Sequence, residues 1–296
     1  MSFKSRVRNL HLISDFTREI MREYQRSKVP ENTCQSEPCL LKWKLNKSLE
    51  EHALNAYPKL LRAFERMNIV FYQQRKLNRS NIKKLGVSPD ALCQVSLQLA
   101  YFRLHGKLAC SYESASLRQF LDGRVDVIRS TSSSIMQLCQ SFFKTKCSTQ
   151  ENEDINSARL LKRALDDQTS QIRKVTNGEG IDNYMLALKQ LSLESFSSND
   201  KSSLVFATSN EFNKCFHFDL STSQVTTSID NSFMFYGPVV DNGYGVCYNI
   251  QAASITYVIS AMINGPANAG IFKEILETIL LRINELLQKY KDESIA

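Results

Sequence analysis

The stretch FMFYGPVVDNGYGVCYNIQAASITYVISAM, residues 233–262, decides the fold class of this chain. Its runs rich in aromatic and β-branched residues are 233–236, 246–249 and 254–262. The Gly, Pro, Asn and Asp residues between these runs favour turns, so the runs predict short β-strands. Two earlier runs of the same character, at 204–208 and 216–221, predict strands as well. The sequence therefore predicts a β-sheet in the C-terminal part of the chain.

Helical patterns dominate the rest of the chain. Apolar residues recur at helical spacing over 47–67, 88–105, 131–146, 154–175, 182–194 and 267–290. Pro58 is expected to break or restart the first of these helices. The second begins with the capping sequence Ser88-Pro89-Asp90 and stops at Gly106; it is apolar nearly all round, so it should be buried. Helices followed by strands and a final helix predict an α+β fold, a two-layer α/β sandwich with a mixed sheet flanked by helices.

Composition narrows the class of protein. The chain has 296 residues, 43% of them hydrophobic and 23% charged, which is typical of a globular protein. No apolar run reaches the roughly 20 residues of a membrane span. The net charge of +7 is dispersed without a nucleic-acid-binding motif, so it favours a phosphorylated small molecule instead. Eight cysteines occur without a Cys-x-x-Cys pair, and we expect no metal site and a reducing, cytoplasmic location.

A basic segment stands directly before the best-defined helix start. Arg79, Lys83 and Lys84 precede Ser88 and Asp90. Because cations and the free N–H groups of a helix N-terminus converge there, this arrangement predicts an anion site. Taken by itself, the segment also fits a solvated basic loop before an ordinary helix.

Further motifs accompany this segment along the chain. They are SPDA at 88–91, YESAS at 112–116, GRVDVIRS at 123–130, GIDN at 180–183, LSTSQV at 220–225 and YGPVVDNGYGVCYN at 236–249. In this order they resemble the C-terminal half of the choline/carnitine O-acyltransferase family, from about residue 42 to 282. The resemblance implies the chloramphenicol-acetyltransferase-like form of the predicted sandwich. It also implies a divergent N-terminal segment at 1–41, a remnant of the catalytic half, before an acyltransferase domain at 42–296.

The resemblance implies acyl transfer between coenzyme A and an alcohol, with acetyl-CoA as co-substrate and no metal. In this family a histidine acts as general base, and hydroxyl groups stabilise the oxyanion. The positions that the resemblance assigns to coenzyme A are Arg79, Lys83, Lys84, Ser88, Asp90, Asn183 and Gln224. Those that it assigns to the oxyanion side are Ser221 and Ser223. Those that it assigns to the alcohol are Tyr112, Ser114, Val125 and Tyr236.

Two positions favour choline over carnitine as the alcohol. The family's carnitine enzymes bind the carboxylate of their substrate with a Thr and an Arg, where this chain has Val125 and Asn183. A carboxylate without these bonds would lose roughly 2–5 kcal/mol. Choline needs an aromatic surface, which Tyr112 and Tyr236 would supply, although Tyr236 also fits an ordinary strand residue. Val127 departs from the choline-type pattern, which commonly has Asn. The resemblance is thus closest to the choline-type enzymes, whose product is the neurotransmitter acetylcholine.

The catalytic histidine of the family belongs to a His-Ser-x-x-Asp-Gly motif, which this sequence lacks. Its four histidines are His11, His52, His105 and His217, and each has the flanks of an ordinary helix, strand or loop residue. We therefore expect the base to lie upstream and this polypeptide alone to be inactive. The alternatives are a carnitine acyltransferase and a non-catalytic protein that binds coenzyme A. Full-length relatives are expected to be monomers.

Overall fold

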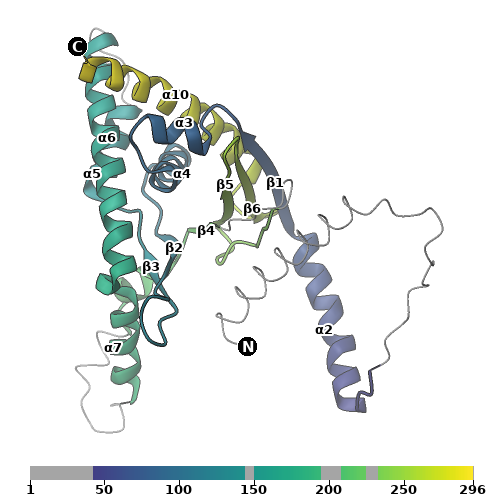
Figure 1. The fold of residues 1–296 in the computed structure, drawn as a ribbon. Coiled ribbons are helices and arrows are strands. Elements are labelled where there is room, and N and C mark those ends of the chain that lie inside the picture. Colours follow the sequence, from purple (N-terminus) through teal and green to yellow (C-terminus); the bar gives the residue numbers. More distant parts are fainter. Residues whose placement is uncertain (1–42, 144–149, 195–207, 225–232, 296) are drawn as a thin grey trace, which may run out of the picture. The chain divides into compact units, whose positions relative to one another are not determined.

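The computed structural model describes residues 43–143, 150–194, 208–224 and 233–295 (Figure 1). Contacts divide the chain into two compact units. One contains Met1–Met67 and Thr227–Ser232, and the other contains Asn68–Thr226 and Phe233–Ala296. The segment predicted at 1–41, His11 with it, and nearly all of the strand predicted at 204–208 lie outside the described residues.

The described part of the first unit is the helix α2, Lys47–Glu65. Asn46 caps the helix, because its side chain accepts a hydrogen bond from the Leu49 amide. The helix continues through Pro58, so the predicted break is wrong. A proline removes one main-chain donor, and the hydrogen bonds of the other turns keep this helix continuous. None of the α2 side chains is buried.

The second unit is built on a mixed sheet of six described strands. They are β1 (Met67–Gln74), β2 (Ser111–Ser116), β3 (Val125–Ile128), β4 (Leu220–Gln224), β5 (Tyr244–Ile250) and β6 (Ile255–Met262). Their order in the sheet is β1-β6-β5-β4-β2-β3. β4 is parallel to both of its neighbours, β2 and β5, whereas β3 and β6 pair antiparallel with β2 and β5. The sheet thus brings together strands that are far apart in the sequence.

The strands predicted at 246–249 and 254–262 are confirmed as β5 and β6. The prediction at 216–221 is only partly right, because β4 begins at Leu220 and the short helix α9 (Asn210–Lys214) precedes it. The strand predicted at 233–236 is wrong, because this segment is irregular. Tyr236 does not pair in the sheet; its side-chain hydroxyl hydrogen-bonds to main-chain carbonyls of β4 and β5. The patterns also do not predict β1, β2 and β3. β2 is Ser- and Glu-rich, and only its neighbours in the sheet make it a strand.

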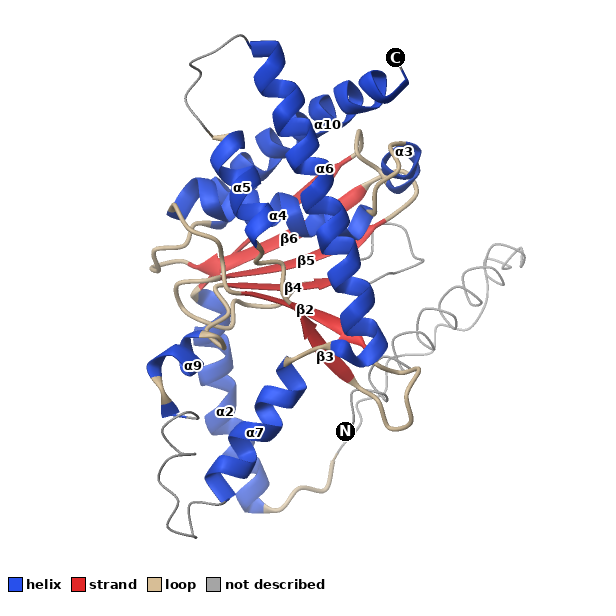
Figure 2. Ribbon diagram, turned by 90° about the vertical axis from the view of Figure 1, so that its left-hand side faces the viewer, coloured by secondary structure: helices blue, strands red, loops and turns tan. Residues whose placement is uncertain are grey.

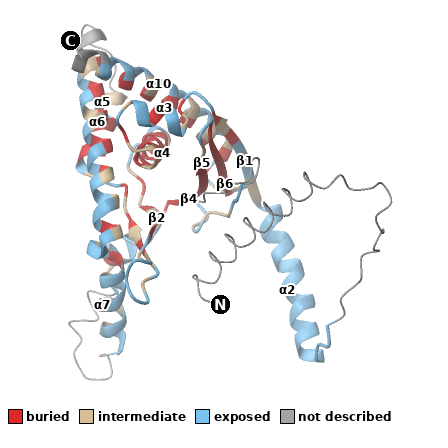
Figure 3. Ribbon diagram, in the orientation of Figure 1, coloured by how far each residue is buried: buried red, intermediate tan, exposed pale blue. Residues whose placement is uncertain are grey.

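Four helices cover one face of the sheet, as Figure 2 shows. They are α4 (Pro89–His105), α5 (Ser133–Phe142), α6 (Gln150–Lys174) and α10 (Ala269–Ile295). The helix predicted at 88–105 is confirmed as α4, with Ser88 as N-cap and Gly106 (φ 68°) as C-cap. α4 is buried on nearly all sides because α5, α6 and α10 pack around it (Figure 3). The predicted α+β sandwich with a mixed sheet is therefore confirmed.

The helices α3 (Arg79–Lys84) and α7 (Asp182–Glu194), together with α9, complete the described helices of the second unit. α3 precedes α4, and α7 confirms the helix predicted at 182–194. A π-helical turn, Val175–Glu179, ends α6. None of the helices in the described part of the chain has the length and apolar character needed to cross a membrane.

The two faces of the sheet differ in character. On the face toward the helices, Leu220, Val246 and Ile259 belong to the buried apolar core. Because side chains alternate along a strand, the residues next to these point to the opposite face. There, Gly245 lies between Ser221 on β4 and Ser260 on β6. The opposite face is therefore the more polar one in this part of the sheet.

Candidate functional site

The predicted coenzyme A positions before α4 form one continuous segment. Arg79 opens α3, Lys83 and Lys84 stand in its last turn, and all three side chains are exposed. The Arg79 amide donates to the Gln251 carbonyl 3.2 Å away, which holds α3 beside the end of β5. Ser88 then caps the N-terminus of α4. Cations beside a capped helix N-terminus suit the binding of phosphate groups.

Asp90 and Gln224 lie on either side of Tyr248, near the carboxyl ends of β4 and β5. The Tyr248 hydroxyl donates to Asp90 Oδ1 over 2.7 Å. Gln224, the last residue of β4, is opposite Tyr248 in the sheet register. The structure therefore gathers the predicted coenzyme A positions of α3, α4 and β4 around the end of β5.

Hydroxyl side chains from β2 and β4 share the face of the sheet away from the helices. Tyr112 is opposite Ser221 in the register of these strands. Ser114 and Ser223 follow two residues later on each strand and therefore point the same way. Ser221 is buried, whereas the other three are half-buried. We call these four residues the hydroxyl patch. The structure thus brings the predicted oxyanion residues, Ser221 and Ser223, close to two of the predicted alcohol residues, Tyr112 and Ser114.

Tyr236 is held against this same face by three hydrogen bonds. Its hydroxyl lies 2.9 Å from the Ser221 carbonyl oxygen on β4 and 3.1 Å from the Val246 carbonyl oxygen on β5, so its single proton is shared by these two acceptors. The Ser260 hydroxyl donates to the Tyr236 carbonyl over 2.5 Å. A Cβ atom on Gly245 would lie only 2.9 Å from that carbonyl oxygen, so the close approach requires glycine. Burial raises the pKa of the Tyr236 phenol, which therefore stays protonated and remains a donor.

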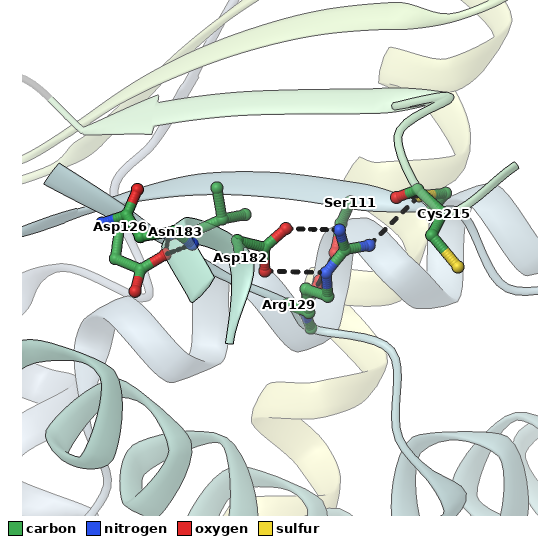
Figure 4. Close-up of polar contacts among 9 residues, drawn as sticks. Ser111, Asp126, Arg129, Asp182, Asn183 and Cys215 are labelled. Atoms are coloured by element: carbon green, nitrogen blue, oxygen red, sulfur yellow. Dashed lines mark hydrogen bonds and ion pairs between the residues drawn. The ribbon is translucent and has the colours of Figure 1, made fainter. Parts of the chain in front are cut away.

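Asn183 and Val125, the two positions predicted to favour choline, touch each other. The Asn183 side-chain amide donates to the Val125 carbonyl over 2.9 Å, and its main-chain amide donates to Asp126 Oδ1 over 3.2 Å (Figure 4). Asp126 is a buried residue of β3, and its carboxylate caps the first turn of α7 by accepting this hydrogen bond. The contacts of Asn183 thus place it with the alcohol positions on β3 and not with α3.

An ion pair fixes α7 to β3 beside this contact. Arg129 donates two hydrogen bonds to Asp182, at 3.0 Å and 2.5 Å, and Asp182 is almost fully buried (Figure 4). The guanidinium also lies 3.5 Å from Cys110 Sγ and stacks against the Phe216 and Phe218 rings. The sequence prediction did not assign roles to Arg129 or Asp182. Their opposite charges at the ends of two motifs are the signal that points to this pair.

A buried polar network lies on the helix-facing side of the same strands. Gln94 Nε2 donates to Thr222 Oγ1 (2.9 Å) and to the Tyr248 hydroxyl (3.0 Å). Thr222 in turn donates to the Tyr112 carbonyl over 2.8 Å. Glu113 is buried beside this network, and burial raises its pKa well above the ordinary value. The sequence patterns do not predict this network. The signal that could have pointed to it is Glu113, a charged residue between Tyr112 and Ser114 that must point to the opposite face of their strand.

The described histidines have partners of their own. Burial lowers the pKa of His105, whose Nε2 lies 3.3 Å from the Tyr244 hydroxyl in the helix-facing core. His52 is paired with the Ser48 carbonyl within α2, as expected for a helix-surface residue. His217 is exposed beside Asn242 in the loop before β4, so its expected place in a strand is wrong.

The family model for choline/carnitine O-acyltransferases matches residues 7–278, which include every element of this site. The chain belongs to the choline/carnitine O-acyltransferase family. Relatives within the family include the choline O-acetyltransferase of Mus musculus, 37% identical over 226 residues that make up 76% of this chain and 34% of the relative. The carnitine O-acetyltransferase of Columba livia is 38% identical over 221 residues, 74% of this chain and 33% of the relative.

The chain spans about a third of the length of these choline/carnitine acyltransferases. Among solved structures, the trichothecene 15-O-acetyltransferase of Fusarium sporotrichioides is similar to 83% of this chain and 53% of its own chain, with a TM-score of 0.40 and 13% identity. Family membership thus rests on the sequence matches, which include relatives of both the choline and the carnitine type.

Proposed function

We propose that this chain is the part of an acetyl-CoA-dependent choline O-acetyltransferase that binds acetyl-CoA and lines the alcohol side of the active site. The observation that carries the proposal is that two sets of residues meet at neighbouring parts of one sheet, the cations of α3 at the end of β5 and the hydroxyl patch on β2 and β4. Cations and a helix N-terminus lie around the end of β5, and hydroxyl groups lie on the opposite face of the adjoining strands.

Each set has a distinct task in the proposed reaction. Arg79, Lys83 and Lys84 bind the phosphates of coenzyme A, and Asp90 and Gln224 contact the rest of the cofactor. Ser221 and Ser223 donate hydrogen bonds to the oxyanion that forms when the alcohol attacks the acetyl carbonyl. The proton of the alcohol goes to a histidine base, which we place upstream of this chain. The cytoplasm, where acetyl-CoA is available, is the proposed location.

The proposed alcohol is choline, because the residues at the two discriminating positions are already paired with each other. The Asn183 amide is engaged by the Val125 carbonyl, and neither residue carries the positive charge that a carboxylate requires. Tyr112 and Tyr236 provide the aromatic surface for a trimethylammonium group. Carnitine O-acetyltransferase is the second candidate, favoured by the pigeon relative at 38% identity.

Calorimetric titration of coenzyme A into the purified chain tests the first half of the proposal. We expect binding, and we expect the double variant Lys83→Ala/Lys84→Ala to weaken it by about tenfold or more, since two charge-assisted contacts to phosphate are lost. The matched control is Lys107→Ala/Lys214→Ala, which removes the same charge from exposed positions outside α3. Equal weakening by both double variants would reduce the effect to net charge and contradict the assigned site.

An acetyl-transfer assay tests the second half. Incubation of the chain alone with acetyl-CoA and choline should give no acetylcholine, because we place the general base outside this chain, and removal of such a base costs about 10²–10⁴-fold. Turnover with choline would show that the chain contains its own base. Turnover with carnitine but not choline would support the second candidate instead.

A further inference from the structure

Glu113 is a buried carboxyl group at the centre of the site. It lies on β2 between Tyr112 and Ser114, but its side chain points to the helix-facing side and is only 4% exposed. In the register of the sheet it is opposite Thr222 on β4 and Ile128 on β3. A carboxyl group in such a place needs either donors for its charge or a proton of its own.

The hydrogens of the neighbouring donors are already in use. The single hydroxyl proton of Thr222 goes to the Tyr112 carbonyl, 2.8 Å away. The two hydrogens of Gln94 Nε2 go to Thr222 Oγ1 and to the Tyr248 hydroxyl. These contacts leave Gln94 Oε1 as a buried acceptor without a partner among the described residues. This part of the network therefore has more acceptors than donors.

Tyr248 has one proton for two neighbouring carboxyl groups. Its hydroxyl lies near Glu113 as well, but it donates to Asp90 Oδ1 over 2.7 Å. Glu113 Oε2 is consequently a second buried acceptor without a partner in the described part of the chain. An ionised Glu113 would be a buried charge without sufficient donors, whereas a protonated Glu113 supplies the donor that the network lacks.

The surroundings favour the charge on Asp90 and the proton on Glu113. Asp90 is half-buried in the first turn of α4, where the positive end of the helix dipole stabilises a negative charge. Glu113 has no such advantage, and burial followed by the charge of Asp90 raises its pKa. The titratable groups that face Glu113 are Asp90 and Cys93 from α4 and Tyr248 from β5.

We propose that Glu113 is a neutral carboxylic acid that donates its proton to Asp90 and thereby positions Asp90 for acyl-CoA. The positioning role rests on the proposed function, whereas the shared proton does not. The hydrogen bond joins β2 to the first turn of α4, so the strand with Tyr112 and Ser114 and the helix at the predicted cofactor site are held together. It also leaves a single negative charge beside an anionic cofactor.

Infrared difference spectroscopy of the unliganded chain tests the proton directly. The spectrum of the wild-type chain at pH 7 is compared with that of Glu113→Gln, an uncharged variant of the same shape. We expect a carbonyl stretch of a protonated carboxylic acid in the wild type that is absent from Glu113→Gln. If the difference shows only the bands of an ionised carboxylate, Glu113 is charged and the proposal is overturned.

Titration of coenzyme A separates positioning from a merely structural role. Glu113→Gln keeps a donor toward Asp90, so its affinity should stay within about threefold of the wild type, whereas Glu113→Ala should lose about tenfold or more because Asp90 is left without that donor. Equal losses in both variants would contradict positioning by a neutral acid. Failure of the wild type to bind coenzyme A would overturn the positioning role and the proposed function, and the infrared result would still decide the state of the proton.

Discussion

The Asn183 side chain donates a hydrogen bond to the main-chain carbonyl of Val125, 2.9 Å away, and so ties the first turn of α7 to the edge strand β3. These are the two positions at which the resemblance to the family predicts choline in preference to carnitine. Because they are in contact, a substitution at one changes the surroundings of the other. Their effects on substrate choice should therefore not be additive.

Replacing Asn183 with alanine should lower the free energy of unfolding by about 0.5–1.5 kcal/mol, since one side-chain hydrogen bond is lost and the bond from its main-chain amide to Asp126 remains. Urea denaturation of the purified chain measures this loss. Asn156→Ala is the matched control, because Asn156 is exposed on α6 and its replacement should change stability by no more than about 0.5 kcal/mol. The contact has no energetic value if the two variants are equally stable.

Asp182→Ala should destabilise the chain more strongly, by about 1.5–3 kcal/mol, because it removes the two charge-assisted bonds from Arg129 at a buried position. The control is Asp166→Ala. Asp166 pairs with Lys162 on the exposed surface of α6, where such pairs contribute about 0.3–0.5 kcal/mol. Thermal unfolding of both variants under one buffer condition compares them, and a larger loss for Asp166→Ala would refute the importance of the buried pair.

The raised pKa of Glu113 predicts how stability depends on pH. Above the ordinary glutamate pKa the unfolded chain releases the proton while the folded chain keeps it, so folding becomes progressively less favourable until pH reaches the folded-state value. Glu113→Gln has no proton to release. The stability of this variant relative to the wild type should therefore rise as the pH increases above about 4.5. Urea midpoints measured across this range provide the test, and a constant difference would mean that Glu113 has an unshifted pKa.

Gly245→Ala should displace the segment at Tyr236. The added Cβ would lie 2.6 Å from Ser260 Oγ and 2.9 Å from the Tyr236 carbonyl oxygen, and both atoms belong to the contact that holds this segment on the sheet. We expect a loss of about 1–3 kcal/mol from overpacking, together with a change in the tyrosine near-ultraviolet circular dichroism.

Gly270→Ala is the control for that substitution. Its Cβ would meet only Asn268 Oδ1 at 3.3 Å, and alanine is favoured by about 0.5–1 kcal/mol over glycine within a helix such as α10. The control should therefore be as stable as the wild type or more stable. If Gly245→Ala behaves in the same way, the segment at Tyr236 adapts and the close approach is not needed.

Local signals in the sequence were sufficient for the long helices and for β5 and β6, but not for the short helices α3 and α9 or for the course of α2 through Pro58. Ser88 and Gly106 define the ends of α4 because capping depends on a few neighbouring residues. β2 and β3 were beyond such signals. These two strands pair with each other. β2 also pairs with β4, which lies about 100 residues away in the chain, and this pairing stabilises its polar residues as a strand.

The candidate site divides in the same way. Ordered motifs in the sequence by itself determined the family; they also predicted the residues of the hydroxyl patch, the cations of α3 and the two positions expected to favour choline. Only the tertiary structure decided that Asn183 bonds to Val125, that Tyr236 lies outside any strand and hydrogen-bonds to β4 and β5, and that Glu113 is buried beside Asp90. The physical reason is that a motif fixes residue types and spacing, whereas hydrogen-bond partners, burial and the location of a proton depend on groups that the fold brings from distant parts of the chain.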